Sequence, residues 1–167
     1  MFIQFTERMK RLLQKRITRY IAAAVLSLLA SCGQHNDSAS SNTQLVDKIE
    51  NAISSGDSVL DLDKVADFSW DSLLILNPYT HLDVVSAELN VDLSSAKESA
   101  IDQRDDINVL LFFANGQQVK LVEFPRISGD FADTTVRFVA RDSAQYEIVE
   151  TQQLNLAGRK SIELRRK

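Results

Sequence analysis

The side chains with the most scope for catalysis or metal binding in this sequence are two histidines, His35 and His81, and a single cysteine, Cys32. Asp83 follows His81 by two residues, and a histidine beside a carboxylate can act as an oriented general base. A hydrolase also needs a nucleophile, and the sequence has no Gly-x-Ser-x-Gly motif to supply an activated serine. We therefore expect no catalytic residue, and a helix-start role for His81 is favoured over catalysis.

The sequence offers little for a metal or phosphate site either. A zinc site needs three or four ligands, and the histidines are too few. Asp57, Asp61 and Asp63 suggest the start of a calcium-binding loop. Such a loop also needs glycine at its sixth position and glutamate at its twelfth, where this chain has Leu62 and Phe68. The five glycines are not clustered, so no phosphate-binding loop is predicted. We expect no metal and no cofactor.

Cys32 closes a segment with the layout of a secretory signal. An apolar run from Tyr20 to Ala30 is within the usual length of a signal core and shorter than the roughly 20 residues that span a bilayer. An ordinary signal or an uncleaved anchor would share this layout, and the cysteine at its end favours lipidation. The run follows six basic residues: Arg8, Lys10, Arg11, Lys15, Arg16 and Arg19.

The four residues Leu29-Ala30-Ser31-Cys32 resemble the lipobox of bacterial lipoproteins. The resemblance implies cleavage before Cys32, a diacylglycerol thioether on its sulfur and a fatty acid such as palmitate on its new amino group. The expected organisation is a signal peptide over 1–31, a lipidated cysteine and flexible tether over 32–43, and a globular domain over 44–167. Gly33 in place of Asp implies export to the outer membrane in a Gram-negative cell.

Charge and cysteine content narrow the classes of partner. The chain from Cys32 onward has 13 basic and 22 acidic residues, a net charge of −9. Such a surface disfavours nucleic acid and anionic headgroups and serves mainly to keep a small domain soluble. If Cys32 is lipidated, no thiol remains for a disulfide, and the domain must fold by its core alone.

A second resemblance lies further along the chain. The pattern Phe-x-Trp-Asp, a mostly apolar run and Pro-Tyr-Thr is similar to one in small uncharacterised bacterial lipoproteins. It implies a fold and a location but no reaction. Trp70 and Tyr79 are candidate binding residues in a groove, and the favoured interpretation is that both instead hold the core or the corner of the strand-helix unit. The matching residues are Phe68, Trp70, Asp71, Pro78, Tyr79 and Thr80.

Hydrophobic periodicity predicts the elements that position these residues. Helical spacing predicts a helix over 43–55, and the continuous run Leu73–Leu76 predicts a strand buried on both faces. Thr80 is expected to cap a second helix whose apolar face holds Leu82, Val85 and Leu89. Residues 91–106 are expected to form a surface loop that includes one helical turn.

The rest of the chain predicts β-structure. Asn115-Gly116 between two β-rich runs predicts a hairpin with a type I′ turn, which sets Phe113 opposite Gln118 and Phe112 opposite Val119. Further strands are expected over 136–139 and 146–149, with a last hairpin around Gly158. The fold class is α+β: one small domain with an antiparallel sheet of about five to seven strands and two packed helices.

Three functions are consistent with these features. The first is a membrane-anchored envelope lipoprotein that is a non-enzymatic binding module, held to the lipid bilayer through Cys32 at the periplasmic face of the outer membrane in a Gram-negative cell. The second is a cell-envelope hydrolase that uses His81 and Asp83. The third is a purely structural envelope domain. No nucleic-acid partner is expected.

Overall fold

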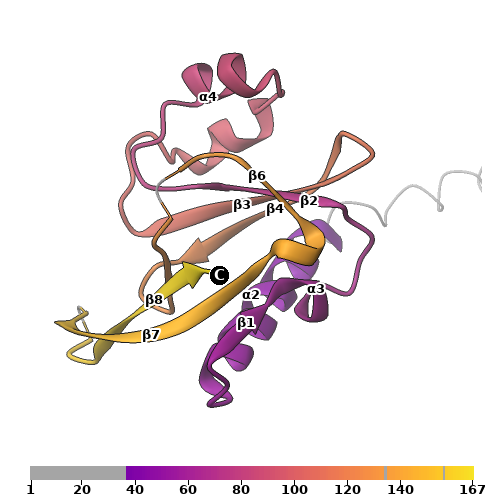
Figure 1. Ribbon diagram of the computed structural model, residues 1–167. Helices are drawn as coiled ribbons and strands as arrows, with labels where there is room; N and C mark the ends of the chain where they lie inside the picture. Colours follow the sequence, from indigo (N-terminus) through magenta and orange to yellow (C-terminus); the bar gives the residue numbers. More distant parts are fainter. Residues whose placement is uncertain (1–36, 134, 156) are drawn as a thin grey trace, which may run out of the picture. The chain divides into compact units, whose positions relative to one another are not determined.

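The computed structural model describes residues 37–133, 135–155 and 157–167, and these form two four-stranded sheets with helices against them (Figure 1). The predicted α+β class is confirmed, and the strands within each sheet pair mostly in antiparallel fashion. The first sheet has the order β1-β7-β8-β5 and the second β4-β3-β2-β6. The strands are β1 (Val59–Asp61), β2 (Ser72–Leu76), β3 (Ile107–Ala114), β4 (Gln117–Pro125), β5 (Asp130–Phe131), β6 (Phe138–Ala140), β7 (Gln145–Leu154) and β8 (Lys160–Arg166).

The eight strands therefore exceed the expected five to seven and form two sheets instead of one. The additional strands are β1 and β5, which have three and two residues. Segments this short carry almost no periodic signal, and only pairing with β7 and β8 makes them strands. The described helices are α2 (Asp37–Ser54), α3 (Leu62–Val65), α4 (Leu82–Leu89), η1 (Ser94–Ser99) and η2 (Arg141–Ser143).

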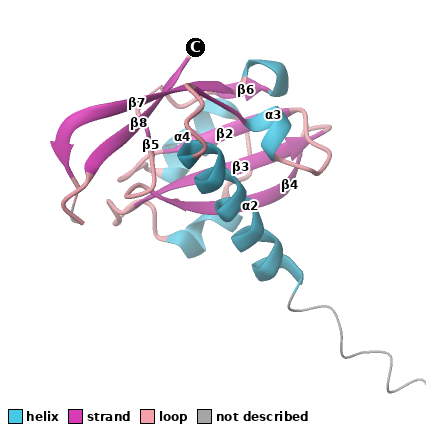
Figure 2. Ribbon diagram, turned by 90° about the horizontal axis from the view of Figure 1, so that it is seen from below, coloured by secondary structure: helices cyan, strands magenta, loops and turns pink. Residues whose placement is uncertain are grey.

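The second sheet is covered on both faces. Leu73 of β2 belongs to the cluster shared with the first sheet and α2, whereas Leu74 and Leu76 belong to the cluster under α4 and η1. β3 alternates in the same way, with Phe112 on one side and Phe113 on the other. The prediction that Leu73–Leu76 is a strand buried on both faces is confirmed, except that Ile75 is half-buried. Figures 1 and 2 show α4 lying over this sheet.

The predicted hairpin is present, with β3 central and β4 at an edge. Asn115 and Gly116 have φ of 53° and 75°, as a type I′ turn requires, and Phe113 pairs with Gln118 as expected. Phe112, however, pairs with Lys120, because a bulge leaves Val119 out of the register. The predicted Phe112–Val119 pair is therefore wrong.

The bulge has a clear physical reason. Residues that face each other across two strands point to the same side of a sheet, so one extra residue exchanges the two faces of everything beyond it. With the bulge, Val122 and Phe124 point into the core, and both are fully buried. Glu123 points outward, where it accepts a hydrogen bond from Arg104 at 2.9 Å. A regular ladder would turn Glu123 toward the face of Phe112, in the core shared with the first sheet, and Phe124 to the opposite face, where Glu123 now lies.

Three expectations about the helices need correction: where α2 starts, which residue caps α4, and the structure of residues 91–106. Helix α2 starts at Asp37, so it includes residues 37–43, which were expected in the tether; no glycine or proline interrupts the chain between there and Gly56. Thr80 does not cap α4, because its hydroxyl donates to the Asn77 carbonyl at 2.6 Å and His81 takes the cap position without a side-chain bond. Residues 94–99 form the 3₁₀-helix η1.

The C-terminal strands also differ in extent. The strand expected over 136–139 is β6, which starts at Phe138, and the strand expected over 146–149 is the longer β7, which continues through Leu154. The last hairpin therefore joins β7 to β8, and Gly158 lies in its turn with φ of 71°.

The signal-like segment, the lipobox and Cys32 lie outside the described residues. No helix within the described ranges is long and apolar enough to cross a membrane.

The hairpin turn makes a testable prediction. Gly116→Ala should lower the free energy of unfolding by about 1 kcal/mol, because an L-residue is strained at positive φ. A Cβ at this position would meet no atom within 4 Å, so the cost comes from the backbone alone. Urea unfolding measures it, with the exposed neighbour Gln117→Ala as the control. Equal stability of the two variants would contradict the turn assignment.

Candidate functional site

Trp70 lies in the core and not in a groove. Its side chain is 3% exposed, and its ring meets the edge of Phe112 with centroids 5.1 Å apart. The guanidinium of Arg141 sits 5.4 Å above the indole and donates to the Trp70 carbonyl, while Arg141 Nε also pairs with Asp63. Trp70 therefore links the start of β2 to α3 and η2. This is a core role and not the groove role considered from the sequence.

Tyr79 has the opposite environment. It follows Pro78 at the far end of β2, is 57% exposed and adopts φ of 62°, which is uncommon for a bulky residue. Its backbone N–H donates to the Ile101 carbonyl at 2.8 Å, and this bond holds the corner. Because β2 lies between them, Trp70 and Tyr79 do not form one binding surface.

His81 and Asp83 do share a recess of about 510 Å³, which Lys97 and Asp102 also line. Asp83 pairs with the ammonium of Lys97 at 3.6 Å, and both side chains are largely exposed. None of the described residues that line the recess is a serine. The carboxylate of Asp83, which the hydrolase alternative would use to orient His81, thus pairs with a lysine.

Asp71 is hydrogen-bonded to the turn of the β3–β4 hairpin. Its carboxylate accepts the backbone N–H of Asn115 at 2.6 Å and the hydroxyl of Ser72 at 2.8 Å. The backbone partner of Asp71 therefore lies 44 residues along the chain. The Asn115 amide, and then the Ser72 hydroxyl, hold the pKa of Asp71 below its ordinary value.

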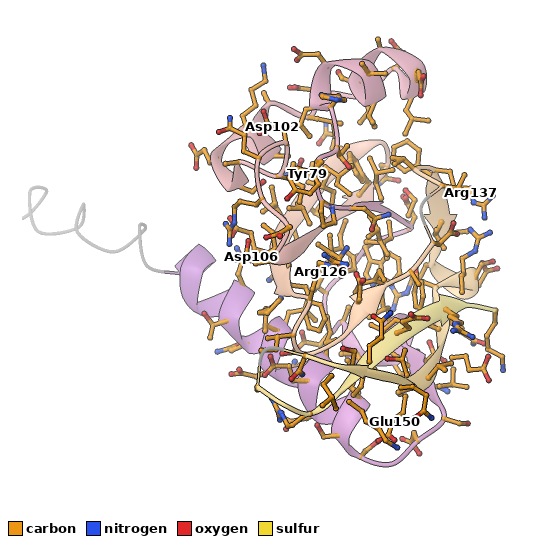
Figure 3. All side chains as sticks on the ribbon, turned by 90° about the vertical axis from the view of Figure 1, so that its left-hand side faces the viewer. Tyr79, Asp102, Asp106, Arg126, Arg137 and Glu150 are labelled. Atoms are coloured by element: carbon orange, nitrogen blue, oxygen red, sulfur yellow. The ribbon has the colours of Figure 1, made fainter. Side chains whose placement is uncertain are left out.

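A strongly basic cleft was not predicted from the sequence. We call it the Asp133 cleft; it has a volume of about 360 Å³. Arg137 contacts the Asp133 carboxylate at 3.2 Å, and Arg166 lies 3.7 Å from it. Figure 3 places Arg137 at one edge of the molecule, well away from Tyr79 and Asp102. The lining residues are Ala132, Asp133, Arg137, Arg165, Arg166 and Lys167.

The charges around this cleft are unbalanced. Four basic side chains line it, against Asp133 and the nearby Glu163, which pairs with Arg165 at 2.7 Å. Burial raises the pKa of Asp133, but the Thr135 amide and the two arginines outweigh it and the net pKa shift is downward. Asp133 is therefore ionised at neutral pH, accepts a hydrogen bond from Arg137 and forms a longer ion pair with Arg166.

A larger recess, of about 720 Å³, lies between α2 and the β7–β8 hairpin but has no excess of one charge. Lys160 pairs with Glu150 there at 3.0 Å, and Glu50 accepts the Ser128 hydroxyl at 2.6 Å. Figure 3 shows Glu150 far from Arg137. Because its two acidic and two basic side chains balance in charge, this recess is a weaker candidate than the Asp133 cleft, which has the larger charge excess, despite its size.

No group of three or more His, Cys, Asp or Glu side chains that could hold a metal occurs in the described part of the chain. The sequence signal that could have revealed the Asp133 cleft is the basic run Arg165-Arg166-Lys167. It became informative only when β8 brought it beside Asp133 and Arg137.

Searches of protein-family models, curated proteins and solved structures find no match for this chain. The resemblance to small lipoproteins with the Phe-x-Trp-Asp pattern therefore stays a prediction.

Trp70→Ala should lower the free energy of unfolding by about 3–5 kcal/mol, because it empties a large buried site against Phe112. Trp70→Phe is the matched control, since it keeps a ring and removes the indole N–H, which has no hydrogen-bond partner among the described residues. It should cost clearly less. Circular dichroism melts measure both, and an unshifted midpoint for Trp70→Ala would contradict a core role.

Asp71→Asn should loosen the hairpin tip in a pH-dependent way. The folded-state pKa of Asp71 is lowered, so its stabilising bond is complete above the unfolded pKa of about 3.9 and is lost as pH falls through the lower folded value. Hydrogen exchange of the Asn115 amide should be faster in the variant at pH 6. The difference should shrink toward pH 2, and a pH-independent difference would rule out the carboxylate as the cause.

Proposed function

We propose that this chain is a lipid-anchored cell-envelope protein whose folded domain is a non-enzymatic binding module. The observation that carries the proposal is the lipobox-like sequence Leu29-Ala30-Ser31-Cys32 after a basic and then apolar segment. Two or three acyl chains on one cysteine provide a stable anchor, because each buried CH₂ contributes about 0.8 kcal/mol and a single chain binds only marginally.

Two features of the domain support a binding role. The Asp133 cleft gathers four basic side chains on a domain whose overall charge is negative, and such a contrast attracts an anionic ligand to one place. Asp83 pairs with Lys97, and none of the described residues that line the recess beside His81 is a serine that could act as a hydrolase nucleophile. Binding therefore fits these side chains better than hydrolysis.

The proposed location in the outer membrane also rests on the sequence. Gly33 after the cysteine favours transfer to the outer membrane in a Gram-negative cell, by resemblance to lipoproteins that lack Asp there. The domain would then face the periplasm on its anchor, with the lipid bilayer as its first partner.

Cys32→Ala should abolish membrane retention. Cells grown with an alkyne fatty acid should label the wild-type protein and not the variant, and fractionation should move the variant to the soluble fraction. Gly33→Asp is the matched control: it should keep the label and, in a Gram-negative host, shift the protein toward the inner membrane. A wild-type protein without label would refute the anchor.

A further inference from the structure

The buried hydroxyl of Tyr146 has no hydrogen-bond partner within the described residues. The side chain is 1% exposed, and its ring packs edge-on against Phe131 with centroids 4.9 Å apart. A buried hydroxyl left unbonded costs about 1–3 kcal/mol, so such a group usually has a water or ligand partner. Burial raises the pKa of Tyr146, which keeps the hydroxyl protonated and able to donate.

Tyr146 lines a small recess with room for about 10 Å³, which is close to the space for one water or one ligand oxygen. Asp133, Arg137 and Arg166 line this recess and also the Asp133 cleft. The recess therefore adjoins the inner side of the cleft, and the unpartnered hydroxyl lies beneath the basic side chains.

The arginines retain donors for a ligand. A guanidinium has five N–H donors, and Arg137 uses one of them for Asp133 in the described structure. Arg166 is only 27% exposed, and its contact with Asp133 at 3.7 Å is longer than a hydrogen bond. A half-buried guanidinium with so little bonding is well placed to hold an oxyanion.

We propose that the Asp133 cleft binds inorganic phosphate or a phosphate monoester, held by Arg137 and Arg166, with the Tyr146 hydroxyl donating to the innermost oxygen directly or through one water. The proposal deepens the binding-module function by naming its ligand, and it rests on that function only for its biological role. It needs no covalent step.

Phosphate fits these donors better than a carboxylate does. A carboxylate has two coplanar oxygens, which one guanidinium can satisfy by itself. Here the donors come from three segments: the β5–β6 connection with Arg137, the end of β8 with Arg166, and β7 beneath them with Tyr146. A tetrahedral group presents oxygens to all three segments, and Arg137 and Arg166 together carry one positive charge more than Asp133 neutralises.

The test is calorimetric titration of the purified full-length chain in non-ionic detergent with inorganic phosphate, and with acetate in parallel. Wild-type protein should bind phosphate and not acetate, and Arg166→Ala should weaken phosphate binding by about tenfold. Arg159→Ala is the matched control, because it removes the same charge from the same hairpin outside the cleft. Equal losses in the two variants, or equal binding of acetate, would overturn the proposal.

Tyr146→Phe separates a ligand role from a structural one. Removing an unpartnered hydroxyl should leave the melting temperature unchanged or raise it, whereas phosphate binding should weaken by about threefold to tenfold. Fluorescence of Trp70, the only tryptophan, reports the melt. A variant that binds phosphate as well as the wild type would exclude Tyr146 from the site.

A lipid headgroup could supply the same phosphate chemistry. To test a lipid as the ligand, binding of the protein to mixed micelles that contain phosphatidic acid is compared with its binding to micelles that contain phosphatidylcholine. If the protein binds phosphatidic acid and Arg166→Ala abolishes that binding, the Asp133 cleft binds phosphate supplied by a lipid. If the protein binds neither phosphate nor phosphatidic acid, the proposal is overturned. Fatty-acid labelling of Cys32 is independent of both arms, so failure of the anchor and failure of the cleft can be told apart.

Discussion

The pairing of β2 with β3, two apolar strands that expose side chains to both faces of one sheet, is the constraint on which the rest of the fold depends. Exposing either apolar face to water is unfavourable, so each face must pack against another element. Helix α4 and η1 cover the face with Leu74 and Leu111, and α2 with the first sheet covers the face with Leu73 and Phe112. The domain therefore needs no disulfide to form two apolar clusters.

The same constraint explains the polar features at the ends of β2. At its start, Asp71 ties the hairpin turn at Asn115, while Arg141 covers Trp70 and pairs with Asp63. Past its end, the corner at Tyr79 is held by the Ile101 carbonyl. These bonds join segments that are distant in sequence. The residues of the Phe-x-Trp-Asp and Pro-Tyr-Thr pattern therefore serve largely to hold the two ends of β2 in place.

The electrostatic asymmetry of the molecule has a different origin. Acidic residues are spread along the chain, whereas Arg137, Arg165 and Arg166 all line the Asp133 cleft because β8 ends beside the β5–β6 connection. Asp133 orients the arginines and neutralises only part of their charge. A cleft with this excess of basic side chains attracts anions even though the chain as a whole has a net negative charge.

Local patterns in the sequence were sufficient for the α+β class, the type I′ turn at Asn115-Gly116 and the two-faced strand Leu73–Leu76, because turn chemistry and periodicity act over a few neighbouring residues. The signal-like segment and its cysteine are likewise read from sequence alone. Tertiary structure decided the bulge at Val119, which serves the burial of Phe124, and the engagement of Asp83 by Lys97. It also decided the meeting of Tyr146 with the basic cleft, since residues from three separate segments come together only when long-range strand pairing places them.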